Sequence, residues 1–165
     1  MGKVSLATKL GMRSEASPRV PDGIGCVSEN DDEAVWPVVD NGKDYFIERN
    51  GIKFAGMHLL IDLWGASRLD DLKLIEDTLV EAAEVSGATI LHTHLHHFSP
   101  NGGISGVVVL SESHISIHTW PERDYAALDI FMCGDCDPYK AVPVLRRAFT
   151  PSGLTISEQK RGLVP

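Results

Sequence analysis

The spacing of apolar residues divides the chain into two parts. Residues 1–50 carry many turn-forming and acidic residues with little sustained periodicity, whereas a regular pattern begins near residue 56. A segment without a repeating apolar face cannot bury enough surface to fix its conformation. We therefore expect a poorly ordered N-terminal extension, residues 1–50, followed by one folded domain, residues 51–165.

A small hairpin is predicted where the extension meets the domain. Two short strand-like segments, 45–47 and 52–54, flank the dipeptide Asn50-Gly51. Asn and Gly tolerate the positive backbone angles that a tight hairpin turn requires. We expect this hairpin to introduce the folded domain.

Helical spacing predicts two helices. The first is expected from about residue 70 to residue 86, with Asp70 as its N-cap and Gly87 ending it. Its apolar stripe consists of Leu72, Ile75, Leu79 and Ala82. The second, shorter helix is expected over residues 138–149, despite Pro143.

Alternation of apolar and polar residues predicts six strands, at residues 57–63, 88–98, 104–112, 114–120, 125–132 and 154–159. In the second strand, alternation places on one face Ile90, His92, His94, His96 and Phe98, and on the other Leu91, Thr93, Leu95 and His97. The order is strand, helix, four strands, helix, strand. It favours an α+β fold, a two-layer α/β sandwich with a mainly antiparallel sheet and the helices on one face.

Composition and charge argue against nucleic acid and membranes as partners. The 165 residues are 43% apolar and 23% charged, with a net charge of -8. An acidic chain lacks the basic footprint of a nucleic-acid binder, and the sequence contains no apolar run of membrane length. We expect a soluble, cytoplasmic protein that binds neither nucleic acid nor membrane. The odd set Cys26, Cys133 and Cys136, without an export signal, favours reduced thiols.

The densest run of reactive side chains is the segment 111–122, which reads SESHISIHTWPE. Upstream stand FSP at 98–100 and SGVVV at 105–109, and downstream FMCG at 131–134. Together these motifs resemble the serine-centred processing motif of prokaryotic S-adenosylmethionine decarboxylases, which are self-processing pyruvoyl enzymes. The resemblance extends over about residues 56–149, and the number of correctly spaced matches makes it specific.

This resemblance implies that the chain is a zymogen that cuts itself. The hydroxyl of Ser113 attacks the carbonyl of Glu112, so that an ester replaces the amide. Beta-elimination then divides the 165 residues into chains of 112 and 53, and residue 113 becomes a pyruvoyl group. The attack needs a stressed peptide, which a tight turn between two strands can provide. The resemblance assigns help in this processing to His118 and Ser105.

For the mature enzyme the resemblance implies pyruvoyl chemistry without pyridoxal phosphate. The pyruvoyl group forms a Schiff base with the substrate amine and accepts the electrons released as carbon dioxide leaves. Cys133 matches the family's proton donor, Glu122 the carboxylate that binds the ribose hydroxyls, and Phe98 the aromatic that stacks on adenine. The implied enzyme is a homodimer whose active sites draw on both protomers. It makes the aminopropyl donor of polyamine (spermidine) biosynthesis.

Two alternatives stay open at this point. The pair Gly102-Gly103 adds one residue between Phe98 and Ser105 relative to the family pattern, which affects the expected position of Phe98. Relatives with the same self-cleavage motif act on ornithine or arginine, so the substrate is less firmly indicated than the cleavage. A non-cleaving paralogue that regulates an active partner is an alternative of a different class.

A zinc site is the rival interpretation of the histidine-rich strand. Alternating imidazoles can converge on zinc, and the candidate ligands are His92, His94, His96, His97, Cys133 and Cys136. However, one Cys-x-x-Cys pair supplies half of a structural zinc site, and the sequence has no second pair. We therefore expect no metal, and we expect the histidines to line a dimer surface or a cleft, where their protonation between about pH 5 and 8 would tune the response to polyamines.

Overall fold

The computed structural model describes residues 45–164, and most of the predicted extension, residues 1–44, lies outside the described residues. Two small strands come first, β1 (Ile47–Arg49) and β2 (Ile52–Phe54). The main elements are β3 (Gly56–Trp64), α1 (Leu72–Val85), β4 (Ile90–His97), β5 (Ile104–Leu110), β6 (Ser113–Trp120), β7 (Tyr125–Cys133), α2 (Ala141–Phe149) and β8 (Gly153–Arg161). Two short 3-10 turns, η1 (Pro121–Arg123) and η2 (Pro138–Lys140), precede β7 and α2.

The predicted hairpin is present. Strands β1 and β2 pair in antiparallel fashion with Arg49 opposite Ile52, which leaves Asn50 and Gly51 as the two turn residues. Both have positive φ, 55° and 75°, as a tight two-residue hairpin turn requires. The amide of Gly134 donates to the carbonyl of Tyr45, which lies two residues before β1, with an N···O distance of 3.2 Å. This bond attaches the hairpin to the end of β7.

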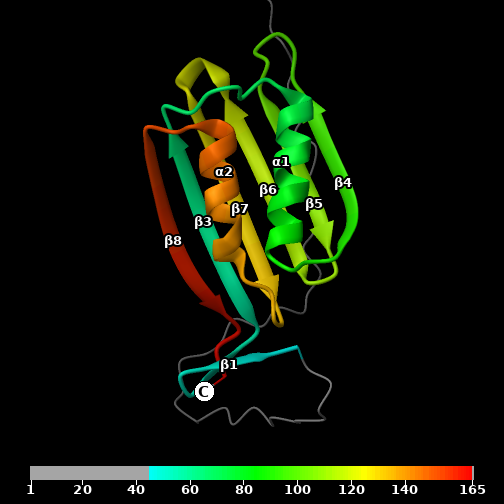
Figure 1. The fold of residues 1–165 in the computed structure, drawn as a ribbon, viewed down its shortest axis with the longest axis vertical. Helices are drawn as coiled ribbons and strands as arrows, with labels where there is room; N and C mark the ends of the chain where they lie inside the picture. Colours follow the sequence, from blue (N-terminus) through cyan, green and yellow to red (C-terminus); the bar gives the residue numbers. More distant parts are fainter. Residues whose placement is uncertain (1–44, 165) are drawn as a thin grey trace, which may run out of the picture. The chain divides into compact units, whose positions relative to one another are not determined.

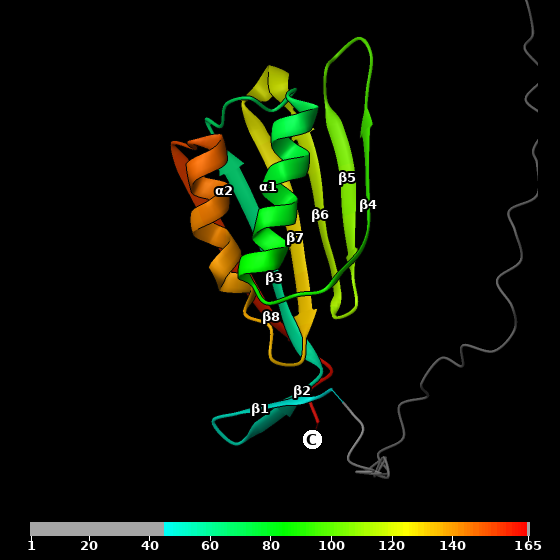
Figure 2. The same ribbon diagram turned by 45° about the vertical axis from the view of Figure 1, so that its right-hand side comes forward.

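Six antiparallel strands form the main sheet, in the order β4-β5-β6-β7-β3-β8. Both helices lie on the same face of this sheet, side by side, as Figures 1 and 2 show. The fold is therefore a two-layer α+β sandwich, and the prediction of its class is confirmed. The face of the sheet opposite the helices, called the open face below, has no covering layer among the described residues.

Apolar stripes on the two helices build the core. Fully buried side chains of α1 and α2 pack on the apolar positions of the central strands, and they include Ile75, Leu79, Ala82, Leu145 and Phe149. Burial of a Leu, Ile or Phe side chain stabilises a fold by about 1.5–3 kcal/mol. The predicted N-cap of α1 was wrong by one residue. Asp71, rather than Asp70, accepts a hydrogen bond from the amide of Leu74 at 3.0 Å.

The second predicted helix divides into η2 and α2. Pro143 is the third residue of α2, within the first turn, where an amide has no acceptor inside the helix. For that reason a proline is tolerated there. Thr150 ends the helix in the left-handed conformation, with φ 44°.

The alternation predicted for β4 fails at its first residue. A bulge lies between Ile90 and His92, so Ile90 pairs with the buried Leu110 on the helix side of the sheet. His92 pairs with Val109 on the open face. An extra residue in one strand reverses the direction of the side chains that follow it. Ile90 therefore packs against the core instead of lying beside the histidines.

The strand predicted at residues 104–112 ends earlier. Strand β5 stops at Leu110, and Ser111 and Glu112 form the turn that leads into β6 at Ser113. The link between Glu112 and Ser113 therefore lies where a tight turn enters a strand. None of the helices within residues 45–164 has the length and apolar character needed to cross a bilayer.

Candidate active site

The turn between β5 and β6 holds Ser113 in a strained conformation. Its φ is 145°, a backbone angle that residues with a side chain rarely adopt. Such a conformation costs about 1–3 kcal/mol and persists only where the surroundings impose it. The structure thus places backbone strain at the serine that the sequence singled out.

Two donors from one residue converge on the carbonyl oxygen of Glu112. The amide nitrogen of Cys133 lies 3.1 Å from this oxygen, and its Sγ lies 3.0 Å away. Cys133 is the last residue of β7, next to the position that pairs with Ser113. Donors at this distance stabilise the negative charge that a carbonyl oxygen gains when a nucleophile attacks its carbon.

The start of β4 fixes the turn from the other side. The amide of Thr89 donates to Oε2 of Glu112 at 2.8 Å. The amide of Ser111 in turn donates to the carbonyl of Thr89 at 2.9 Å. These bonds hold the residues that precede Ser113 and so help to impose its unusual φ.

The sequence analysis gave no role to His114, which lies beside Ser113. Its Nδ1 is 3.1 Å from the hydroxyl oxygen of Ser113. Consecutive residues of a regular strand point to opposite faces, so alternation argued against this contact. The one feature of the sequence that could have indicated this contact is the histidine directly after the serine.

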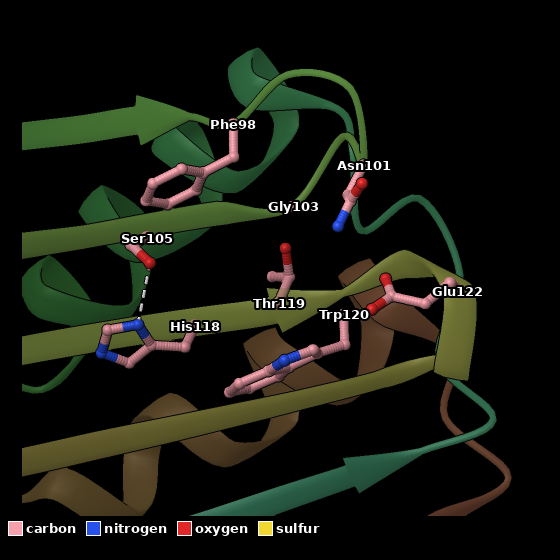
Figure 3. A pocket seen from close by; sticks show the side chains of 8 residues that line it. All are labelled: Phe98, Asn101, Gly103, Ser105, His118, Thr119, Trp120 and Glu122. Atoms are coloured by element: carbon pink, nitrogen blue, oxygen red, sulfur yellow. Dashed lines mark hydrogen bonds between the residues drawn. The ribbon is translucent and has the colours of Figure 1, made fainter. Parts of the chain in front are cut away.

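A second group of predicted residues lines a pocket near the other end of β6. The pocket has a volume of about 210 Å³. Figure 3 shows it at the ends of β4, β5 and β6. Its lining includes the four predicted residues Phe98, Ser105, His118 and Glu122, together with Asn101 and Trp120. The additional residue at Gly102-Gly103 therefore leaves Phe98 in the same pocket as the other three.

Strand pairing explains the contacts inside this pocket. Ser105 lies directly opposite His118, and Oγ of Ser105 is 2.8 Å from Nδ1 of His118. The ring of Phe98 meets the ring of His96 edge to face, with the centroids 4.6 Å apart. Trp120 continues the aromatic lining, 6.3 Å from His118 between ring centroids.

Aromatic side chains extend the pocket wall across the open face. The ring of Tyr125 lies between those of Trp120 and Trp64, at centroid distances of 5.3 Å and 4.3 Å. The hydroxyl of Tyr125 donates to Asp62 at 2.5 Å. This hydrogen bond, aided by burial, raises the pKa of Tyr125 to about 12.

Within one chain the two groups are far apart. Ser113 and His118 are five residues apart along β6, a separation of about 16 Å at the rise of a strand. One chain therefore contains two separate groups. Ser113 and Cys133 lie beside the turn between β5 and β6, called the processing turn below after the role that the sequence predicts for it, and His118 lies in a distant pocket. The structure does not bring His118 and Ser105 to Ser113 of the same chain.

Comparison with known proteins identifies the family. The sequence model of the family described as S-adenosylmethionine decarboxylase matches residues 57–162. The chain belongs to the S-adenosylmethionine decarboxylase family. The match includes β8, whereas the resemblance found from the motifs alone ended at α2.

Relatives support this membership over the whole domain. An S-adenosylmethionine decarboxylase proenzyme from Thermomicrobium roseum is 40% identical over 114 residues, which cover 68% of this chain and 98% of the relative. An S-adenosylmethionine decarboxylase proenzyme from Methanococcus maripaludis is 44% identical over 116 residues, which cover 68% of this chain and 94% of the relative. The crystal structure of the adenosylmethionine decarboxylase from Aquifex aeolicus superposes with a TM-score of 0.60 at 34% identity, covering 68% of this chain and 94% of that one.

The rival zinc ligands do not assemble in this S-adenosylmethionine decarboxylase family member. His92, His94 and His96 lie on β4 at the edge of the sheet, whereas Cys133 lies on β7, three strands away. Cys136 is buried, and its Sγ donates to the carbonyl of Gly87 at 3.3 Å. Burial raises the pKa of this thiol, which disfavours the thiolate that zinc requires. Among residues 45–164, no three His, Cys, Asp or Glu side chains are grouped so as to hold a metal ion.

Proposed function

We propose that the chain cuts itself between Glu112 and Ser113 and that the mature enzyme decarboxylates S-adenosylmethionine with the pyruvoyl group made from Ser113. One observation carries the proposal. The strained Ser113 directly follows a carbonyl whose oxygen accepts bonds from two donors of Cys133. Strain raises the energy of the ground state, and the donors stabilise the oxyanion.

Self-cleavage begins with attack of the Ser113 hydroxyl oxygen on the carbonyl carbon of Glu112. The amide C–N bond breaks and an ester forms. Elimination then removes the proton from the Cα of residue 113, releases the carboxylate of Glu112 and leaves a dehydroalanine. The dehydroalanine tautomerises to an imine, and water hydrolyses the imine to the ketone of the pyruvoyl group and ammonia. The products are chains of 112 and 53 residues, the second of which begins with a pyruvoyl group.

The pyruvoyl group would supply the electron sink for decarboxylation, the role that pyridoxal phosphate plays in other enzymes. No pyridoxal phosphate is then required. Cys133, at the end of β7 beside residue 113, is the proposed donor of a proton to the substrate carbon that loses carbon dioxide. A thiol is mostly protonated at neutral pH, as a proton donor must be.

The pocket fits the polar and aromatic parts of S-adenosylmethionine. Glu122 offers a carboxylate to the ribose hydroxyls, and Phe98, half exposed in the pocket, offers a face to adenine and to the sulfonium. A cation on an aromatic face gains about 0.5–2 kcal/mol. The names of the relatives favour this substrate over ornithine and arginine. The product would be the aminopropyl donor of spermidine synthesis in the cytoplasm.

We also propose that the active enzyme is a homodimer joined through the open face. The processing turn and the pocket lie about 16 Å apart in one chain, so a second copy is needed to bring a pocket to each pyruvoyl group. The open face presents large apolar side chains that a second copy would cover, Leu60, Trp64, Phe98, Val109 and Trp120. Exposed apolar patches of this kind mark association surfaces.

The test compares the wild-type chain with Ser113→Ala. Denaturing mass analysis of wild type should give the two fragments, the smaller beginning with a ketone, and S113A should give the intact chain. Carbon dioxide release should be seen with S-adenosylmethionine and not with ornithine or arginine. An intact wild-type chain would favour the non-cleaving regulatory alternative, and release from another substrate would change the substrate but not the cleavage.

A further inference from the structure

We infer that His114 is the general base of the self-cleavage, taking the proton of the Ser113 hydroxyl as that oxygen attacks Glu112. This inference rests on the proposed self-cleavage and assigns it a residue that the family resemblance leaves without a role. The contact that motivates it is the 3.1 Å distance between Oγ of Ser113 and Nδ1 of His114. A general base must lie within hydrogen-bond reach of the proton that it abstracts.

The strained backbone makes this contact possible. By register Ser113 pairs with Leu110 and Met132, both buried on the helix side, whereas His114 pairs with Phe131 on the open face. In a regular strand the two side chains would point apart. The φ of 145° at Ser113 departs from that geometry. The same distortion therefore stores strain in the backbone beside the peptide bond and brings the hydroxyl to the imidazole.

Neighbouring rings orient the imidazole of His114. The ring of Phe131 lies 6.2 Å from it and that of His58 lies 6.3 Å from it, both edge to face. The charged groups on this part of the open face contact His58, whose Nδ1 is 3.2 Å from Arg161 and whose Nε2 is 3.3 Å from Asp129. Nδ1 of His114 meets the serine hydroxyl, which requires the ring proton to be on Nε2.

The proposed step balances without a co-reactant. Nδ1 takes the hydroxyl proton while Oγ forms a bond to the carbonyl carbon, and Cys133 stabilises the oxyanion. When the C–N bond breaks, Nδ1 returns the proton to the nitrogen of residue 113. An amide has become an ester and an amine, and His114 is neutral again.

The experiment follows the cleavage rate of the full-length chain carrying His114→Gln. Loss of a general base should slow the appearance of the two fragments by about 100-fold or more. His97→Gln is the matched control. His97 is the last residue of β4 and pairs with the buried Ile104, at the end of the sheet far from Ser113, and its side chain faces the helix side. The control should cleave at the wild-type rate. In His114→Ala, added imidazole should restore cleavage, which a merely structural role would not allow.

Hydroxylamine identifies the step that is blocked, because it cleaves esters and leaves amides intact. The H114Q chain should resist it, since the amide has not rearranged. The inference is overturned if H114Q cleaves at the wild-type rate, if hydroxylamine releases the fragments from it, or if imidazole fails to accelerate H114A. An uncut wild-type chain would overturn the proposed function as well, so the two failures are distinguishable.

Discussion

Cys133 contacts the carbonyl of Glu112, the proposed site of the cut, through both its backbone and its side chain. Its amide and its thiol each approach the Glu112 oxygen within 3.1 Å. A thiol is a weaker donor than an amide, so the backbone contact should contribute most of the stabilisation and the thiol the remainder. The same sulfur is the proposed proton donor of the later decarboxylation. One residue would therefore serve two successive reactions.

Substitution of Cys133 should separate these two roles. We expect Cys133→Ala to slow self-cleavage by about tenfold, less than the 10²–10³ lost with a strong oxyanion donor. Cys133→Ser keeps a donor and should cleave faster than C133A, yet its hydroxyl is too weak an acid to replace the thiol in decarboxylation. Time courses of fragment formation and of carbon dioxide release measure both effects. If C133A cleaves as fast as wild type, the thiol has no part in the first reaction.

At the residue scale, the sequence predicted which residues form the site better than it predicted the contacts between them. The motif singled out Ser113, the carbonyl of Glu112 and Cys133, and the structure brings the three together. That Cys133 contacts this carbonyl was not predicted, because the motif indicated Cys133 only as the proton donor of the later decarboxylation. The contact of His114 could not be predicted, because it depends on a backbone angle that breaks the alternation of a regular strand. Local distortion is set by the surrounding bonds, here those of Thr89.

Among the elements, β3 and β7 are joined by a hydrogen bond as well as by their ladder. The hydroxyl of Tyr125 on β7 donates to Asp62 on β3, and the ring of Tyr125 stacks on Trp64 at the end of β3. This contact lies at the end of the sheet that carries the pocket. It should couple the pocket wall to the centre of the sheet.

The Tyr125 contact predicts a stability change at high pH. The folded pKa, about 12, lies above the ordinary tyrosine value of about 10, so the folded state holds the proton more tightly. This contribution is fully present below pH 10 and is lost as the pH rises toward 12. The free energy of unfolding of Tyr125→Phe should therefore fall below that of wild type at pH 8, and the difference should shrink by pH 11. Urea unfolding at both pH values measures it, with both proteins also carrying Ser113→Ala so that the chain stays whole and unfolds reversibly. A constant difference would contradict the assignment.

The elements themselves were predicted well, because alternation and helical spacing are strong over the domain. The failures lie at boundaries. The bulge after Ile90 adds one residue to β4 and reverses its first side chain, and the cap of α1 falls on Asp71 rather than on its acidic neighbour. Two adjacent aspartates are equivalent as caps in sequence, and only the path of the chain selects one.

At the scale of the whole molecule, the sequence could not give the order of the strands. Strand β3 lies between β7 and β8, pairings that join distant parts of the chain and leave no local pattern. The separation of the processing turn from the pocket has a different origin, since the two lie at opposite ends of β6. It motivates the proposed dimer, in which each active site takes the turn of one protomer and the pocket of its partner.

Mixed dimers test whether the sites are shared. In a dimer of Ser113→Ala and Glu122→Gln protomers, one site carries both defects and the other carries none. Random association makes about half of the dimers mixed, so co-expression should restore roughly a quarter of wild-type decarboxylation. The pair S113A and Cys133→Ala is the control, since both residues lie at the same end of one chain and so belong to the same half of the proposed site, and neither site would be intact. No restoration with the first pair would indicate that each site is built from one chain.

Strand order also decides what the proposed cut would do to the molecule. The fragment ending at Glu112 contributes β3, β4 and β5, and the fragment beginning at Ser113 contributes β6, β7 and β8. Three strand junctions, β5 with β6, β7 with β3 and β3 with β8, then join different polypeptides. The fragments would stay interleaved, but after denaturation they would have to find each other by diffusion. The proposed maturation would thus give the protein a lifetime limited by its first complete unfolding, because dilution then works against reassembly.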